Sequence, residues 1–168
     1  MGFKELIFLV LVATSVSSCY SFKGTTISPD VKTFFIGNFR NNAPNAPAEI
    51  GQLFSDRLRE KVLRESRLAY SEVDPSVEFE GSVTSFSVSS VAPSSEGGQI
   101  GSSLNRLSIS VNVEYINYIN EDASFTQSFS FFQDFESTEN LFDVQESLTE
   151  EIFNQITEDV FNKTFSDW

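Results

Sequence analysis

The chain has 168 residues, with 24 acidic side chains, 11 lysines and arginines and no histidine, and its formal net charge of −13 argues against a nucleic-acid partner. Histidine is the commonest general base and the commonest metal ligand, and it is absent from this sequence. The sequence also contains no phosphate-binding glycine loop, no nucleophile elbow and no zinc-ligand spacing. We therefore expect no enzyme, no metal site and no bound cofactor.

The first 18 residues have the layout of a secretory signal, with a charged start at Lys4, an apolar run over residues 6–13 and small residues near a cleavage point. The run is shorter than the roughly 20 residues that a spanning helix needs. Val-Ser-Ser-Cys at residues 16–19 resembles a bacterial lipoprotein box. This resemblance implies cleavage before Cys19, a diacylglycerol on its sulfur and an N-linked acyl chain, which anchor the protein to a membrane. The alternative is an ordinary signal peptide followed by a free thiol.

Residues 19–30 are polar and predict a lipid-anchored tether, and residues 31–168 have the size of a single domain. A β-rich apolar stretch at 31–39 predicts a strand. A helix is expected from about Ala48 to Arg67, because apolar residues recur there at spacings of three and four. One side of this helix carries three bases, which either bind phosphate or acidic lipid or pair with neighbouring acids on an exposed face: Arg57, Lys61 and Arg64.

Three strands are expected in the middle of the chain, at about 77–88, 107–115 and 125–132. In the first of them, the apolar phase changes by one residue near Thr84 and Ser85, which predicts a bulge or a sharp bend. The glycine- and serine-rich segment 92–103 predicts a long loop at one end of the sheet. We take this segment as a candidate partner-binding loop, with three glycines that allow it to adapt: Gly97, Gly98 and Gly101.

In the second and third strands, apolar residues alternate with Ser, Thr and Asn, so one sheet face is expected to meet water or a partner. A last helix is expected from about Glu139 to Lys163, capped by Ser137 or Thr138. Two amphipathic helices can bury their apolar stripes on the same face of a sheet. The predicted fold, in the order β-α-β-β-β-α, is a two-layer α+β sandwich with two helices on one face of a four-stranded, mostly antiparallel sheet.

Short stretches along the mature chain share their order and spacing with one family: CYSFKG at 19–24, FEG at 79–81, QSFS at 127–130, DFES at 134–137 and the C-terminal segment 152–168. They resemble the LptE family of lipopolysaccharide-assembly lipoproteins, as it occurs in Bacteroidetes. The resemblance implies one LptE-like domain over residues 31–168 and a non-enzymatic role. Such a protein sits inside the outer-membrane β-barrel LptD, plugs it, helps it to fold and assists delivery of lipopolysaccharide. No run of acids follows Cys19, which implies an outer-membrane anchor on the periplasmic side.

The resemblance also places a contact with lipopolysaccharide phosphates near the loop-bearing end of the sheet. Arg106 is the only base there, so it is our candidate contact residue, and a simple surface role is the alternative. A second class of function is a periplasm-facing, lipid-binding accessory lipoprotein of another lipid transport system. A third is a structural anchor between the outer membrane and a periplasmic machine. The 18 phenylalanines suit a lipid cavity, but such residues more often fill a core.

Overall fold

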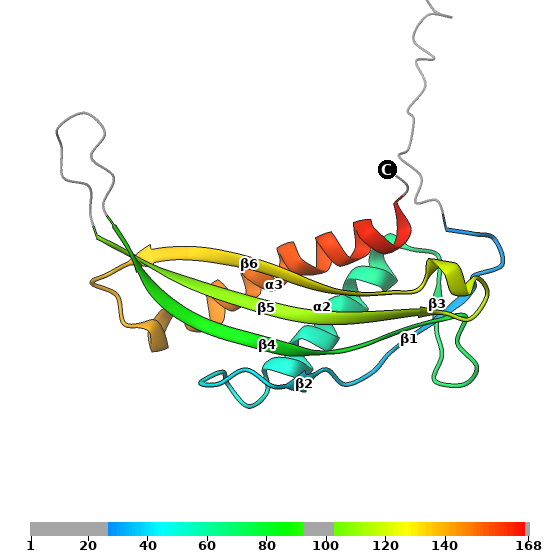
Figure 1. Cartoon of the computed structure of the whole chain (residues 1–168), viewed down its shortest axis with the longest axis horizontal. Coiled ribbons are helices and arrows are strands. Elements are labelled where there is room, and N and C mark those ends of the chain that lie inside the picture. Colours follow the sequence, from blue (N-terminus) through cyan, green and yellow to red (C-terminus); the bar gives the residue numbers. More distant parts are fainter. Residues whose placement is uncertain (1–26, 93–102, 167–168) are drawn as a thin grey trace, which may run out of the picture.

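The computed structural model describes residues 27–92 and 103–166, which form two long helices and one sheet (Figure 1). Cys19 and the three loop glycines at positions 97, 98 and 101 lie outside the described residues. The elements in chain order are β1 (Thr33–Ile36), β2 (Arg40–Asn41), α2 (Ile50–Glu65), β3 (Ala69–Tyr70), β4 (Val77–Val91), β5 (Leu104–Asn117), a 3₁₀ turn η1 (Glu121–Ala123), β6 (Phe125–Glu136) and α3 (Leu141–Phe165).

The sheet has six strands in the order β3-β1-β4-β5-β6, and β2 pairs with β4 beyond the end of β1. β4, β5 and β6 form an antiparallel meander, whereas β1, β2 and β3 pair in parallel. The α+β class is as predicted, but the four-stranded, mostly antiparallel sheet is corrected to a mixed, six-stranded one. β1 and β4 are parallel because α2 carries the chain back across the sheet between them. β2 and β3 have two residues each, too few to show an alternation in the sequence.

β4 contains the predicted bulge. Val83 pairs with Val111 and Ser85 pairs with Ser110, so Thr84 is an extra residue without a partner of its own in the ladder. The extra residue shifts the alternation of β4 by one position. The apolar residues of both halves of β4 therefore face the helices, although their phases differ in the sequence.

Both predicted helices are present with slightly different ends. α2 is two residues shorter at each end than predicted, and α3 is displaced by two residues toward the C-terminus. Asn140 caps α3, because its Oδ1 accepts a hydrogen bond from the backbone N–H of Phe142 at 3.0 Å. The prediction of Ser137 or Thr138 as the cap was wrong. The backbone N–H of Ser137 donates to the carbonyl oxygen of Ser103 at 3.1 Å, which extends the pairing of β5 with β6.

Aromatic rings fill the interface between the sheet and the helices. Phe54 of α2 contacts Phe39 and, across the helix pair, Phe153 of α3, with 4.8 and 5.1 Å between ring centroids. All three rings are buried, and each pair meets edge to face, an arrangement that adds to the free energy gained from burial. These rings join α2 to α3 and to the segment between β1 and β2.

α2 approaches the edge of the sheet very closely at Gly51. A Cβ atom on Gly51 would lie 2.0 Å from the carbonyl oxygen of Phe39, in the segment between β1 and β2. One turn later in α2, the hydroxyl of Ser55 accepts a hydrogen bond from the backbone N–H of Phe39 at 3.0 Å. The same hydroxyl can donate to the carbonyl oxygen of Gly37 at 3.1 Å. Ser55 thus satisfies buried backbone groups where the strand is interrupted.

We predict that Gly51→Ala lowers the free energy of unfolding by about 1–3 kcal/mol, because the added methyl forces α2 away from the sheet edge. Urea denaturation of the purified protein measures this change. Gly37→Ala is the matched control, since the nearest atoms to its added Cβ lie at 3.5 Å or more. Equal stability of the two variants would contradict the close approach at Gly51.

Candidate functional site

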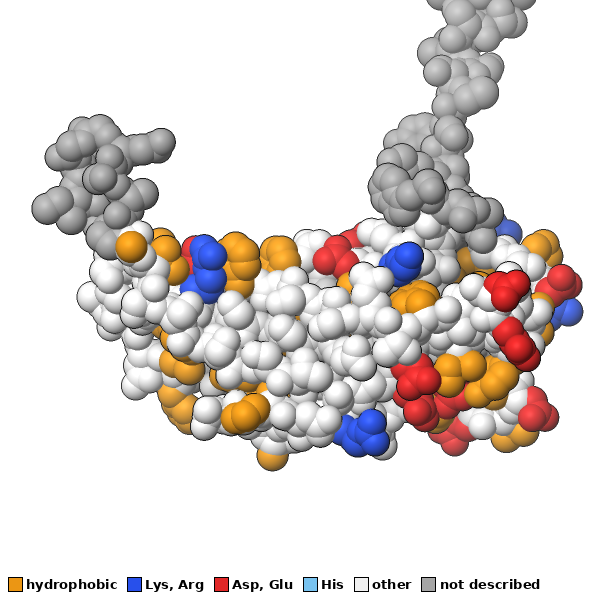
Figure 2. Space-filling view, in the orientation of Figure 1, with side chains coloured by type: hydrophobic (Ala, Val, Ile, Leu, Met, Phe, Trp, Pro, Cys, Tyr) orange, Lys and Arg blue, Asp and Glu red, His pale blue; other side chains and the backbone are white. Residues whose placement is uncertain are grey.

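The outer face of the sheet is a polar surface that the two helices leave open. Both helices lie behind the sheet in Figure 1, so the face turned toward the viewer in Figure 2 carries no helix of the described chain. Short uncharged polar side chains from three adjacent strands dominate it: Ser85, Ser87, Ser89, Ser108, Ser110, Asn112, Thr126, Ser128 and Ser130. The polar face predicted for the second and third strands is therefore present and extends onto β4.

Hydrogen bonds between neighbouring strands hold some of these hydroxyls in place. The hydroxyl of Ser110 donates to that of Ser130 at 3.0 Å, and the hydroxyl of Thr84 donates to the carbonyl oxygen of Ser110 at 3.2 Å. These groups are small and carry no charge. This uncharged part of the outer face can therefore form hydrogen bonds to a partner without the large cost of desolvating ions.

Arg106 lies on this face near the end of the sheet that carries residues 92–103. It stands directly opposite Asp134 in the ladder of β5 and β6. Its Nε and Nη2 atoms donate to the two carboxylate oxygens of Asp134 at 2.7 and 2.9 Å, and its guanidinium lies 3.6 Å from the ring centroid of Phe132. The hydrogen bonds from Arg106 lower the pKa of Asp134, and the same bonds raise the pKa of Arg106.

This arrangement bears on the predicted role of Arg106. Two of its donors already serve Asp134, and one side of its planar group is covered by Phe132. A phosphate that binds Arg106 must therefore compete with Asp134 for the guanidinium. Contact between Arg106 and lipopolysaccharide remains a prediction, and it requires that a phosphate replace Asp134 as the partner of the guanidinium.

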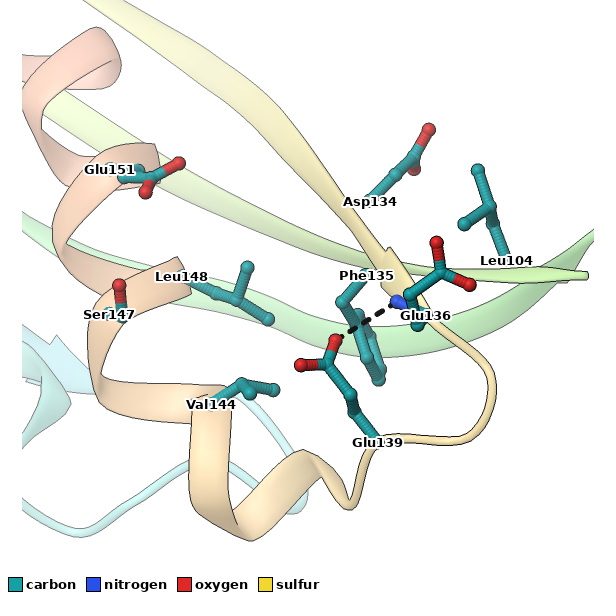
Figure 3. A pocket seen from close by; sticks show the side chains of 9 residues that line it. All are labelled: Leu104, Asp134, Phe135, Glu136, Glu139, Val144, Ser147, Leu148 and Glu151. Atoms are coloured by element: carbon teal, nitrogen blue, oxygen red, sulfur yellow. Dashed lines mark hydrogen bonds between the residues drawn. The ribbon is translucent and has the colours of Figure 1, made fainter. Parts of the chain in front are cut away.

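A shallow pocket of about 380 Å³ opens where the ends of β5 and β6 meet the start of α3 (Figure 3). Apolar side chains and acids both line it: Leu104, Phe135, Val144, Leu148, Ser147, Asp134, Glu136, Glu139 and Glu151. A carboxylate oxygen of Glu139 accepts a hydrogen bond from the backbone N–H of Glu136 at 3.1 Å, and Glu151 accepts one from the side chain of Gln133 at 2.6 Å. The pocket suits a group that combines an apolar stem with a positive charge.

Sequence reasoning missed this pocket. Its acids come from a strand, a turn and a helix, and no single period in the sequence links them. The only signal is the local excess of acids over bases between residues 134 and 151, which by itself indicates no more than a solvated surface.

The basic stripe on α2 forms ion pairs with α3. Arg57 contacts Glu150, and Lys61 contacts both Glu158 and, at 2.8 Å, Glu65 of its own helix. Burial lowers the pKa of Lys61, but the hydrogen bonds with Glu158 and Glu65 outweigh this effect and raise the pKa overall. Of the two interpretations of the basic stripe, pairing with acids therefore agrees better with the structure than a phosphate-binding site. The main partners belong to α3, not only to α2 itself.

In the described ranges 27–92 and 103–166, no helix is long and apolar enough to cross a membrane. Within the same ranges, no three His, Cys, Asp or Glu side chains are grouped so that they could hold a metal ion.

Comparison with known proteins gives one family. The family model LptE, described as lipopolysaccharide-assembly, matches residues 31–164. Among curated proteins, none matches the sequence.

Solved structures share the fold at low sequence identity. A hypothetical protein from Chlamydia trachomatis is 9% identical with a TM-score of 0.55, and the match covers 81% of this chain and 99% of that one. A protein from Xanthomonas campestris is 12% identical with a TM-score of 0.53, over 84% and 86% of the two chains. A minor lipoprotein from Acinetobacter baumannii is 6% identical with a TM-score of 0.50, over 80% and 92%. At these identities the matches concern the fold alone.

We predict that acid weakens the fold through the pair of Lys61 and Glu158. The hydrogen bond from Lys61 is the main reason why the pKa of Glu158 lies below its usual 4.5. A carboxylate with a lowered pKa stabilises the fold fully above its unfolded value, and this contribution is lost as the pH falls through the lower folded value. Glu158→Gln should therefore lose less stability than the wild type between about pH 5 and pH 3, as measured by urea denaturation.

Glu146→Gln is the matched control for this experiment, because Glu146 is an exposed acid of the same helix. It should keep the acid dependence of the wild-type protein. The same acid dependence in the Glu158→Gln variant and in the control would contradict the prediction.

Proposed function

The chain belongs to the LptE family of lipopolysaccharide-assembly lipoproteins, and from this membership we propose that it occupies and helps to assemble the LptD β-barrel of the outer membrane. In this role it takes part in the transport of lipopolysaccharide to the cell surface. It performs no chemistry, and its work is to bind. The single observation that carries the proposal is the family match over residues 31–164.

The outer face supports the proposed site of action. The interior of an outer-membrane barrel is polar, so a protein that sits there needs a surface that forms hydrogen bonds. The face formed by β4, β5 and β6 supplies hydroxyl and amide groups over adjacent strands, next to acids such as Glu80 and Glu114. We propose that this face contacts the wall of the barrel, and that the loop with Gly97, Gly98 and Gly101 extends the contact beyond the sheet.

The N-terminal sequence supports the proposed location. We propose that Cys19 carries a diacylglycerol and an N-linked acyl chain, palmitate among the candidates, and that these hold the protein at the outer membrane on its periplasmic side. Seven residues lie between Cys19 and the first described residue, Ile27, and the eight steps from one Cα atom to the next span at most about 28 Å. The domain therefore stays close to the membrane surface.

The proposal predicts that a barrel of the LptD class co-purifies with the protein. Full-length protein from native outer membranes, extracted in mild detergent, should retain this partner in near-equal amounts, as mass spectrometry measures. Recovery of the protein alone, or with inner-membrane transporter subunits, would contradict the plug role and favour a lipid-binding accessory of another lipid transport system.

Two matched variants locate the contact. Asn112→Arg places a bulky charge on the outer face of β5 and should reduce the recovered barrel. Asn154→Arg makes the same change on the exposed side of α3 and should leave recovery unchanged. Equal recovery with both variants would exclude the outer face as the contact surface.

A further prediction concerns lipopolysaccharide and Arg106. Asp134→Asn should release the guanidinium of Arg106 and raise the affinity for lipopolysaccharide several-fold at low salt, as measured by titration with lipopolysaccharide micelles. The gain should fall as salt rises, because phosphate and guanidinium attract each other electrostatically.

Two controls separate this effect from the general loss of a negative charge. Glu114→Gln removes one charge from an exposed acid on the same sheet face and should change the affinity little. Adding Arg106→Ala to the Asp134→Asn variant should abolish the gain. An unchanged affinity in Asp134→Asn, or a gain that survives without Arg106, would remove Arg106 from the lipopolysaccharide contact.

A further inference from the structure

β6 lies at one edge of the sheet, and among residues 27–92 and 103–166 no strand pairs with its far side (Figure 1). Within the described part of the chain, the backbone groups of residues 125–135 form hydrogen bonds only with β5. Residues 125–135 of this strand therefore present a row of backbone N–H and C=O groups along its outer edge that have no partner within the described chain. Such an edge pairs readily with another extended strand.

β6 also lacks the features by which edge strands usually avoid such pairing. Its sequence, FTQSFSFFQDFE, contains no proline, no glycine and no lysine, and its register with β5 has no bulge. Its two acids, Asp134 and Glu136, lie at its C-terminal end. The central part of the edge is therefore open to a partner strand.

The sequence of β6 is complementary to itself in the antiparallel direction. On the outer face, a twofold axis at Ser130 sets Thr126 opposite Asp134 of a second copy, so no two charged side chains of the strands stand opposite each other. Aromatic pairs across neighbouring strands are stabilising. On the helix-facing side, the same axis pairs similar residues: Phe129 with Phe131, Gln127 with Gln133 and Phe125 with Phe135.

The two ends of β6 add complementary charge. Lys163 of α3 lies 5.7 Å from the ring centroid of Phe125, and the ion pairs among the described residues do not involve it. The acidic pocket lies at the opposite end of β6, where Phe135 forms part of its wall. The twofold register sets Phe125 opposite Phe135 of the second copy. It therefore brings Lys163 to the pocket of that copy, beside carboxylates such as Glu139 and Glu151.

We propose that two copies of this chain associate through β6, which joins their sheets into one and places Lys163 of each copy at the acidic pocket of the other. The partner is a second copy because two independent features agree under one axis: the side-chain register of β6 and the match of Lys163 to the pocket. The association uses the edge of the sheet and does not depend on the proposed function. It describes the protein when no barrel is bound.

Disulfide cross-linking in native membranes tests the register. Ser130 lies on the proposed axis, and paired residues on adjacent strands have Cα distances that suit a disulfide. Full-length protein with Ser130→Cys should therefore form a linked dimer on oxidation. Thr126→Cys is the matched control on the same face of β6, and it should not link, because it stands opposite Asp134 of the second copy. The wild-type chain shows the background due to Cys19. Equal linking of the two variants would overturn the proposal.

Sedimentation in detergent tests the association without a covalent bond. The wild-type protein should form a dimer as its concentration rises, and Ser130→Lys should keep it monomeric, because two ammonium groups then meet at the axis. Ser87→Lys makes the same change on the outer face of β4, away from the edge, and should behave as the wild type does. A wild-type protein that stays monomeric, or a Ser130→Lys variant that still forms dimers, would overturn the proposal.

Discussion

The close contact between α2 and the interrupted edge of the sheet is the constraint on which the other features depend. Gly51 lets the helix backbone touch the backbone at Phe39, and Ser55 satisfies the polar groups that the interruption leaves unpaired. This contact holds α2 over the sheet in the position where Phe54 reaches Phe153 of α3. With a side chain at position 51, the helix would lie farther out and the buried polar groups would lose their partner.

The position of α2 determines which surfaces remain for function. α2 and α3 cover one face of the sheet together, and ion pairs between them use much of the positive charge of α2. The opposite face keeps its uncharged hydroxyl and amide groups, and the outer edge of β6 is not paired with any other part of the described chain. The outer face thus combines a patch of uncharged hydroxyl and amide groups with exposed acids such as Glu80 and Glu114, and separate charged groups lie at the two ends of β6.

Local periodicity explains why much of the fold could be predicted from the sequence. The alternation in β5, the spacing in α2 and the phase change at Thr84 are all properties of short segments, and each appears in the structure. The parallel pairing of β1 depends on where the chain returns after α2, so no short segment reveals it. The same holds for the pair of Arg106 and Asp134, which are 28 residues apart and meet only through the register of β5 with β6. The pocket is formed by residues of three elements, so no short segment reveals it either. Cys19 lies outside the described residues, so its lipidation stays a prediction.

The bulge at Thr84 also limits how this sheet can change in evolution. Side chains of a strand alternate between its two faces. One residue gained or lost in β4 beyond the bulge would therefore turn the polar side chains of the following strand residues toward the helices and their apolar side chains toward the outer face. Insertions and deletions in the paired part of the β4–β5 hairpin are therefore tolerated in steps of two residues. In related proteins, the lengths of the strands that correspond to β4 and β5 should therefore differ by even numbers of residues. The segment 92–103 between the two strands is not subject to this rule.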